Sequence, residues 1–308
     1  MASILTANGL KGRYKLSYGQ TKAQQAWARL CRTVKSDQPD GETYAGRQGI
    51  DGIHEAKGDD RRTDPIGVKF ALPHRKFQGG FTIPGPDWRF NKVGSVQDDL
   101  DELSEQASVA PAELLLTTIM GAGSLTGVDG KAFFATDHPI DGANTQSNEL
   151  TAGVLNIGAT VPTTEEWYDI LFLFGLSFRN FKQATGLRIM PLQRDITIAV
   201  NDALFPSLTK AITTLNGTDG ESNALKSQSE FRFSPLFLPD YTEDLKMIAI
   251  ADAKGAFIYQ ELESLGDLDV FADGSEYYRD HDEVKATVRG YYNCGIDRWQ
   301  GALRATLS

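Results

Sequence analysis

Apolar positions recur at helical intervals over residues 95–120. They form one stripe, which consists of Val96, Leu100, Leu103 and Ala107. This spacing predicts a long amphipathic helix with Ser95 as its N-cap. Because proline has no backbone N–H to give to a helix interior, Pro111 predicts a kink or a short break near Val109–Ala110. The piece from Pro111 to Met120 is apolar enough to be buried nearly all round.

The chain before this helix shows a weaker pattern. Residues 1–20 lack a regular period and are expected to form an extended arm, and Thr21–Arg32 is expected to be a short helix. Residues 36–65 are polar and glycine-rich, which is typical of a loop. Apolar and polar residues then alternate in two runs, Ile66–Pro73 and Lys76–Ile83. We expect these two runs to pair with each other as a two-stranded ribbon.

A second amphipathic helix is predicted over Pro162–Phe181. Thr163 or Thr164 is the expected N-cap, and two glutamates follow in the first turn. Its apolar stripe consists of Trp167, Ile170, Leu171, Phe174 and Phe178. This is the spacing of a helix with one face in the core.

Helix and strand patterns alternate in the remainder of the chain. Asp195–Val200 predicts a strand, Ala203–Thr214 a helix, and residues 216–235 a loop. From Leu245 to the C-terminus the pattern favours strands. The mixture predicts an α+β fold, and 308 residues can bury a large core in two lobes.

Charge and cysteine content narrow the functional classes. The net charge is −10, yet residues 1–35 hold seven basic residues and no acid. A solvated tail, a contact with DNA and a contact with a neighbouring subunit all fit such an arm. Trp27 and Leu30 give it apolar side chains to dock, so we favour the subunit contact. No run of 18 apolar residues predicts a membrane helix, and Cys31 and Cys294 lack metal-ligand spacing and fit a reducing compartment.

Candidate catalytic and metal-ligating residues are sparse. The histidines are His54, His74, His138 and His281, and all four fall in predicted loops, where we expect turn and surface roles. Asp137 beside His138 suggests a general base or half of a metal site, which leaves a cytosolic α/β enzyme as one alternative function. No phosphate-binding glycine loop or nucleophile elbow occurs. We therefore expect no enzymatic activity, no cofactor and no bound metal.

Several segments, in their order along the chain, carry a family resemblance. They are RKFQGGFTIPGPDWRF (75–90), DGKAFFATDHP (129–139) after the long helix, LRIMPLQRDITIAVNDALFPSLTKAI (187–212), GAFIYQE (255–261) and RGYYNCGIDRWQGAL (289–303). Together they resemble the major head (capsid) subunit of Mu-like tailed phages and prophages. The resemblance implies the Hong Kong 97-like capsid fold, with an N-terminal arm, an extension loop, a spine helix, and peripheral and axial domains.

The same resemblance implies a division of the chain and a function. The expected parts are an N-terminal arm (1–45), an extension loop (46–93), a spine helix of the peripheral domain (94–124), a mainly axial domain (125–245), and peripheral-domain strands with a C-terminal return to the axial domain (246–308). Copies of such a subunit would self-assemble into pentamers and hexamers that form an icosahedral head around phage DNA. The expected location is the virion capsid, assembled in the cytoplasm of a bacterial host.

Partners also follow from the resemblance. A portal protein, a scaffold and a head-maturation protease would act in trans, a decoration protein is a further candidate, and packaged double-stranded DNA would be held by non-specific contact, with no membrane involved. An alternative with the same fold is an encapsulin-type nanocompartment shell, which encloses protein cargo instead of DNA.

Opposite charges predict how neighbouring subunits dock. The segment before the long helix carries Arg61, Arg62, Lys69, Arg75, Lys76, Arg89 and Lys92, and the helix carries Asp98, Asp99, Asp101, Glu102, Glu105 and Glu113. In the family, the extension loop of one subunit lies over the spine of the next, so we expect these charges to face each other. Phe77, Phe81 and Trp88 would be apolar anchors under them, and Trp27 an anchor from the arm.

The resemblance raises a covalent possibility as well. Some capsids of this fold join subunits by a lysine–asparagine bond, for which Lys69 or Lys76 with Asn293 would be the candidates here. No carboxylate in the sequence is evidently placed to catalyse such a bond. We therefore expect subunits that are not covalently linked.

Overall fold

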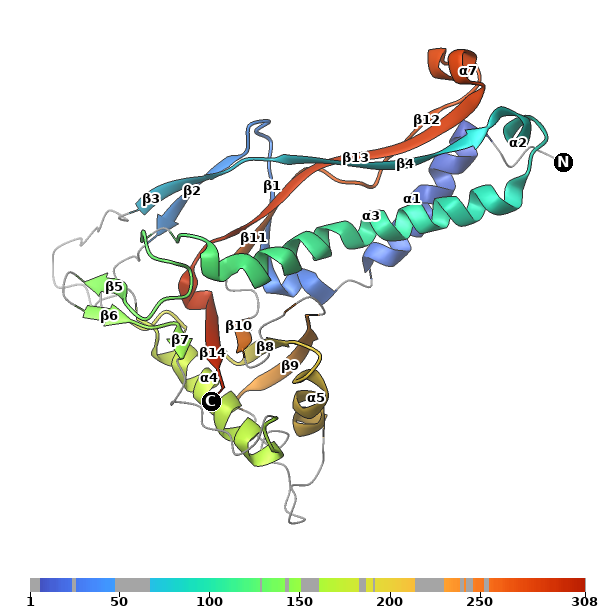
Figure 1. The fold of residues 1–308 in the computed structure, drawn as a ribbon. Helices are drawn as coiled ribbons and strands as arrows, with labels where there is room; N and C mark the ends of the chain where they lie inside the picture. Colours follow the sequence, from blue (N-terminus) through green and yellow to red (C-terminus); the bar gives the residue numbers. More distant parts are fainter. Residues whose placement is uncertain are drawn as a thin grey trace.

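The computed structural model describes residues 6–23, 26–47, 67–127, 129–141, 144–150, 161–182, 187–190, 192–213, 230–238, 241, 246–251 and 255–307. Two five-stranded sheets organise these residues. Figure 1 shows an elongated upper layer, in which β4, β13 and α3 run side by side, above a lower lobe that contains α4 and α5. The fold is thus mixed α and β, as the sequence predicts.

The first sheet forms the upper layer. Its strands are β1 (Cys31–Lys35), β11 (Phe257–Glu263), β13 (Glu283–Ile296), β12 (Leu268–Phe271) and β4 (Arg75–Pro84). The order is β1-β11-β13-β12, and β4 pairs with β13 antiparallel, from Pro84 opposite Glu283 to Arg75 opposite Tyr292. β1 is parallel to β11, and the other pairs are antiparallel.

Two helices pack against this sheet and against each other. The long helix α3 (Val93–Gly121) is unbroken, with Pro111 inside it. Of the predicted kink or short break near Val109–Ala110, the break is therefore wrong. It begins two residues before Ser95, after Lys92, and Ser95 is not its N-cap. Leu114, Leu116 and Met120 are only half-buried, so its last turns are not buried all round.

The N-terminal segment is a helix, α1 (Ala7–Ala23), and the expected extended arm over residues 1–20 is wrong. Leu10, Tyr14 and Tyr18 lie four residues apart and are buried, which places them on one helical face. The Tyr14 hydroxyl donates a 2.6 Å hydrogen bond to the Leu265 carbonyl. After α1, a short 3-10 helix (Ala26–Leu30) leads into β1, where the sequence pattern predicted a helix over Thr21–Arg32.

The predicted ribbon has different partners in the structure. β2 (Glu42–Arg47) pairs antiparallel with β3 (Gly67–Leu72) as a separate two-stranded sheet. β4 does not pair with β3 but joins β13. The ribbon of Ile66–Pro73 with Lys76–Ile83 is therefore wrong, because β13 offers β4 a longer apolar partner than β3 does. A short helix, α2 (Gly85–Arg89), connects β4 to α3.

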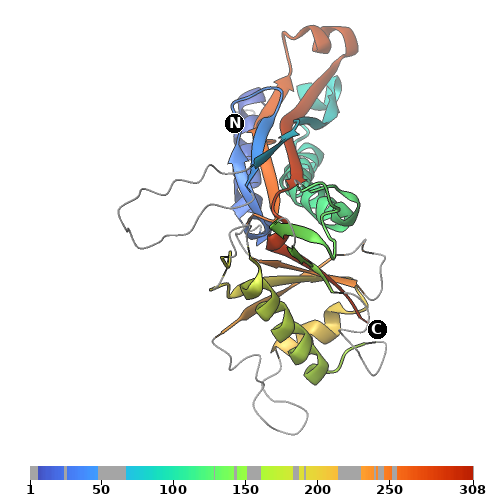
Figure 2. The ribbon, with the colours of Figure 1, turned by 90° about the vertical axis from the view of Figure 1, so that its left-hand side faces the viewer.

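The second sheet belongs to the lower lobe (Figure 2). Its order is β7 (Glu149–Leu150), β14 (Ala302–Thr306), β10 (Lys246–Ala251), β8 (Asp195–Val200) and β9 (Arg232–Phe237). The sequence predicted β8 with these bounds but assigned β9 to a loop. Helices α4 (Thr164–Asn180) and α5 (Phe205–Thr213) lie below this sheet.

The N-terminus of α4 confirms the predicted cap. The Thr163 side chain accepts a hydrogen bond from the Glu166 N–H, and the Glu166 side chain accepts one from the Thr163 N–H. This reciprocal pair satisfies two backbone donors that a helix end leaves free. Trp167, Leu171 and Phe174 are fully buried, so the predicted core stripe is also confirmed.

Several smaller elements connect the two sheets and the main helices. β5 (His138–Asp141) pairs with β6 (Asn144–Gln146). A helix missed by sequence, α7 (Glu276–His281), lies between β12 and β13. Short 3-10 helices follow α3 (Ala122–Ser124) and precede β14 (Trp299–Gly301). None of the helices within the described residues is long and apolar enough to span a membrane.

Candidate functional site

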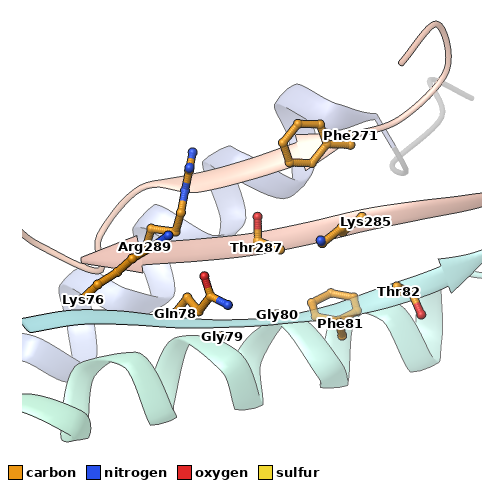
Figure 3. A pocket seen from close by; sticks show the side chains of 10 residues that line it. All are labelled: Lys76, Gln78, Gly79, Gly80, Phe81, Thr82, Phe271, Lys285, Thr287 and Arg289. Carbon is orange, nitrogen blue, oxygen red and sulfur yellow. The ribbon is translucent and has the colours of Figure 1, made fainter. Parts of the chain in front are cut away.

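A shallow groove lies on the outer face of the first sheet, where β4, β13 and β12 run side by side (Figure 3). Its volume is about 430 Å³. It is lined by Lys76, Gln78, Gly79, Gly80, Phe81, Thr82, Phe271, Lys285, Thr287 and Arg289. These side chains come from strands that are far apart in sequence, so the groove was not visible in any one segment.

Strand alternation decides which side chains line the groove. On β13, Val284 and Val288 are buried, whereas Arg289 is exposed and Lys285 half-exposed, as expected when successive side chains point to opposite faces. The register places Lys285 opposite Thr82 and Arg289 opposite Gln78. One lysine and one arginine of β13 therefore lie beside the polar side chains of β4.

Gly80 lets β4 approach β13 at the floor of the groove. A Cβ atom on Gly80 would lie 2.3 Å from the Ala286 carbonyl oxygen. No side chain can occupy that space without moving the backbone. Gly80 thus keeps the groove open between the two rows of polar side chains.

The groove carries more positive than negative charge. Arg289 forms a 2.5 Å ion pair with Asp269 on β12, and this hydrogen bond raises the pKa of the arginine. Lys285 Nζ lies 5.3 Å from the centre of the Tyr277 ring, within the range of a cation–π contact. Together with Lys76, the lining holds three cations, of which one is paired with a carboxylate.

The exposed side of α3 is acidic. Asp98, Asp99, Glu102, Glu105 and Glu113 are exposed. Asp101 is instead paired within the chain, because Arg13 of α1 lies 2.5 Å from its carboxylate. The predicted acidic helix face is therefore present, but Asp101 is partly neutralised by its own subunit.

The aromatic residues expected at an interface contribute to the fold of their own chain. Phe77 stacks on Tyr292 with ring centres 4.2 Å apart, and Trp27 meets Tyr259 edge to face at 5.1 Å. Trp88 is buried, and its Nε1 donates to Asp273 at 3.2 Å. That burial corrects the expectation that Trp88 is free to anchor a neighbour. Phe81 is half-buried and lines the groove.

The remaining residues predicted at the interface fall into two groups: some form ion pairs within the chain, and others lie outside the described residues. Arg89 pairs with Asp282 at 2.8 Å, and Lys92 with Asp87 at 2.7 Å, both within the chain. β4 packs on α3 of its own subunit, since Leu103 Cδ1 would lie 3.5 Å from a Cβ on Gly79. The inner face of β4 therefore cannot lie over a neighbour's helix, which limits the predicted charge pairing to outward side chains. Arg61, Arg62 and the side chain of Lys69 lie outside the described residues.

His138 corrects the expectation of turn and surface roles for all histidines. It is fully buried, with Nδ1 2.6 Å from Asp129 Oδ2 and its ring stacked 4.2 Å from Trp299. Asp137, the partner suggested by sequence, is exposed and pairs with Lys131. Asp137 and His138 thus do not form a catalytic pair, and sequence reasoning missed Asp129 and Trp299 because neither is a neighbour in the chain.

The other residues considered as catalytic or metal-ligating candidates also lack a reactive arrangement in the described part of the chain. His74 contacts the buried Gln260, His281 is exposed at the end of α7, and His54 lies outside the described residues. Burial raises the pKa of the Cys31 thiol to about 12, which disfavours the nucleophilic thiolate at neutral pH. Within the described part of the chain, no group of three or more histidine, cysteine, aspartate or glutamate side chains could hold a metal ion.

Comparison with known proteins agrees with this arrangement. The sequence profile of the family described as "Mu-like prophage major head subunit gpT" matches residues 5–170. The Mu-like prophage FluMu major head subunit of Haemophilus influenzae (strain ATCC 51907 / DSM 11121 / KW20 / Rd) is 26% identical over 154 residues, which cover 49% of this chain and 49% of that protein. The match therefore spans about half the length of this relative.

Solved structures show the fold. The procapsid subunit of bacteriophage JBD30 superposes with a TM-score of 0.53 and 17% identity, covering 97% of this chain and 74% of that one. The mature capsid of bacteriophage PhiM1 gives a TM-score of 0.56 and 10% identity, covering 92% and 87%. The expected Hong Kong 97-like capsid fold is thereby confirmed.

Proposed function

Because the chain belongs to the family of Mu-like prophage major head subunits, we propose that many copies of it assemble into the icosahedral head of a tailed phage. The observation that carries this proposal is the family match over residues 5–170 on a chain whose whole fold is that of a phage capsid protein. The protein is then a structural component of the virion capsid, formed in the host cytoplasm.

The alternatives have less support. An encapsulin-type shell has the same fold, but the family match favours a head subunit. The enzyme alternative depended on Asp137 and His138, of which one is exposed and paired with Lys131 and the other is buried against Trp299. A general base must reach its substrate, and the buried imidazole offers no such access.

We propose that the domain division follows the two sheets. Residues 94–124 and most strands after residue 255 would be the peripheral domain, and the sheet of β7, β14, β10, β8 and β9 the axial domain. Residues 46–93 would contain the extension loop. The C-terminal strand β14 would be the return of the chain to the axial domain. Pentamers and hexamers would then form around the axial domains.

The outer groove is the surface we assign to a neighbouring subunit. Its excess of positive charge suits an acidic segment of a second copy, and the exposed carboxylates of α3 are one source of such charge. Exposed ion pairs contribute about 0–1 kcal/mol each. They would therefore steer docking and set its register more than they would raise affinity. Portal, scaffold, protease, decoration protein and packaged DNA would be the other partners.

Electron microscopy and a charge reversal test the two parts separately. The wild-type chain is expected to form closed shells. Lys76→Glu with Lys285→Glu is expected to leave a folded subunit, by circular dichroism, that fails to form them. Lys11→Glu with Lys182→Glu makes the same change in net charge away from the groove and serves as the control.

The outcomes distinguish the proposals. A small discrete oligomer of the wild-type chain would contradict shell formation altogether. Normal shells from the Lys76/Lys285 variant would contradict only the groove as a charged contact. Early assembly of the wild type should also weaken as salt is raised, because salt screens charges beyond about 10 Å at 0.1 M.

A further inference from the structure

The sheet of β2 and β3 shares no strand pairing with the first sheet among the described residues. Figure 1 shows this β2–β3 sheet beyond the end of β4 that lies away from α2. The β2–β3 ladder ends at Leu72, and the β4–β13 ladder begins at Arg75. Pro73 and His74 lie between the two ladders. Side-chain contacts at this bend, and not a shared ladder, must therefore set the direction of the β2–β3 sheet.

Two side-chain amides of the first sheet converge on the bend. Gln260 of β11 and Asn293 of β13 are directly opposite in register, so their side chains lie on the same face. Gln260 Nε2 donates to the Leu72 carbonyl oxygen at 3.0 Å, and Asn293 Nδ2 donates to that of Pro73 at 2.7 Å. Both amides are buried. Two neighbouring amides thus bind two consecutive carbonyl groups, and we call them the amide clamp.

Hydrogen bonds at the other end of each amide fix its orientation. Gln260 Oε1 accepts from the Tyr44 hydroxyl at 2.7 Å, and Asn293 Oδ1 accepts from the Cys294 N–H at 2.9 Å. A flip of either amide would set its oxygen against a carbonyl oxygen of the bend. Because Tyr44 belongs to β2 and Leu72 to β3, the clamp holds both strands of the β2–β3 sheet.

Close packing supports the clamp. A Cβ atom on Gly41, whose φ is +98°, would lie 2.2 Å from the Leu72 carbonyl oxygen, and one on Gly295 would lie 3.0 Å from Leu72 Cδ1. On the β1 side, Ser36 Oγ donates to Glu42 at 2.9 Å. The carbonyl groups that the clamp binds are therefore held by packing as well as by hydrogen bonds.

We propose that Gln260 and Asn293 are positioning residues for shell assembly, because the amide clamp holds the β2–β3 sheet in the one direction in which it meets a neighbouring subunit. This inference rests on the proposed function, in which β3 belongs to the extension loop. A buried hydrogen bond of this kind biases an equilibrium by about fivefold, so the two bonds of the clamp bias it by about 25-fold. A part that is held in its binding direction loses less conformational entropy when it docks.

A distance measurement on the full-length chain tests the clamp. Double electron–electron resonance requires two spin labels, one at Arg47→Cys at the end of β2 and one at Glu105→Cys on the exposed side of α3. Cys31 and Cys294 are buried, so the chain without introduced cysteines should take up no label. With the clamp intact, we expect a single narrow distance. Shell formation is followed by electron microscopy of unlabelled chains that lack the two introduced cysteines.

Gln260→Met with Asn293→Leu replaces both amides by apolar side chains of similar length. This double variant is expected to lose the narrow distance and to form no closed shells. Gln193→Met is the matched control, because Gln193 is also buried and donates from its side chain to the Asp195 carbonyl, beside β8 of the second sheet. It should lower the midpoint of chemical denaturation but keep both the narrow distance and the shells.

The outcomes separate the clamp from the proposed function. A narrow distance in the folded double variant would overturn the clamp, and normal shells from a variant that has lost this distance would overturn its role in assembly. If the double variant does not fold, Tyr44→Phe replaces it, since it removes only the hydroxyl that joins β2 to Gln260. An unchanged distance in Tyr44→Phe would then overturn the clamp. A wild type without shells would contradict the proposed function, while the distances would still confirm or refute the clamp.

Discussion

Two glycines in helix interiors illustrate how a single residue's environment sets the sign of a substitution. Gly12 lies in α1, and a Cβ atom there would meet nothing within 4 Å. Gly175 lies in α4, and a Cβ atom there would come within 2.5 Å of the Phe231 ring. Phe231 is itself buried, with Arg179 4.3 Å from its ring centre, so it has little room to move.

The same change at these positions should have opposite effects on stability. Gly12→Ala is expected to raise the free energy of unfolding by about 0.5–1 kcal/mol, because alanine loses less backbone entropy in a helix. Gly175→Ala is expected to lower it by about 1–3 kcal/mol, because the methyl group overpacks the core. Chemical denaturation of the two variants measures both changes in the free energy of unfolding. Equal effects of the same sign would mean that the packing around Gly175 is looser than the structure shows.

His138 marks the limit of residue-scale prediction. The sequence identifies the turn that contains it, and both phenylalanines of that turn are buried. From the sequence, the adjacent Asp137 is the expected partner of His138. In the structure, the contacts of His138 come from Asp129, Asn148 and Trp299. Only tertiary structure brings Trp299 to the ring, so no local spacing could have indicated this buried contact between histidine and aspartate.

At the scale of elements, prediction succeeded where local and tertiary signals agree. Helix α4 has both a capping box and an apolar stripe, and strand β8 is an apolar run between turn residues. Helix α1 has neither a cap of this kind nor a strong stripe, and it contains glycines at positions 9, 12 and 19. Its helical state depends on packing against α3 and β12, which is a tertiary effect that outweighs propensity.

The pairing of β4 with β13 has a similar explanation. The alternation of apolar and polar residues in β4 predicted a strand, which is confirmed. Such alternation does not indicate which other strand it pairs with. β3 is the neighbour in sequence, and β13 is the partner in space, 200 residues away. The groove on β4, β13 and β12 could not be anticipated for the same reason, although Lys76 and Phe81 were singled out in advance.

The packing of α1 can be measured through one hydrogen bond. Tyr14→Phe removes the hydroxyl that donates to the Leu265 carbonyl and leaves that acceptor buried. The expected loss is about 1–2 kcal/mol in the free energy of unfolding. Tyr291→Phe, at a half-exposed position of β13, is the control and should change stability by less than about 0.5 kcal/mol. A neutral Tyr14→Phe would indicate that α1 does not pack as the structure describes.

At the scale of the whole molecule, charge is distributed between faces. The outer sheet face carries Lys76, Lys285 and Arg289, and the exposed side of α3 carries carboxylates. The sequence predicted the acidic helix correctly but placed the positive charge on one segment. In the structure two of these three cations, Lys285 and Arg289, come from β13. The polarity therefore belongs to the assembled sheet and not to any single stretch of chain.

The last prediction concerns the covalent state of the assembled shell. A lysine–asparagine bond would form by attack of a lysine amine on the Asn293 side-chain carbonyl carbon, with release of ammonia. Asn293 is buried, its Nδ2 donates to the Pro73 carbonyl at 2.7 Å, and its Oδ1 accepts from the Cys294 N–H. The Nδ2 end therefore helps to hold the bend between β3 and β4, and the Oδ1 end is bound within β13. Breaking these two hydrogen bonds would cost about 1 kcal/mol each.

Shells heated in denaturing detergent should consequently migrate as a single-chain band of about 34 kDa. Asn293→Asp is the informative variant, because it cannot form the bond and also loses the amide donor to Pro73. It should lower subunit stability without changing the gel pattern. A ladder of linked subunits in the wild type, removed by Asn293→Asp and by Lys69→Ala or Lys76→Ala, would contradict this prediction. Such a ladder would mean that Asn293 leaves its buried position when subunits meet.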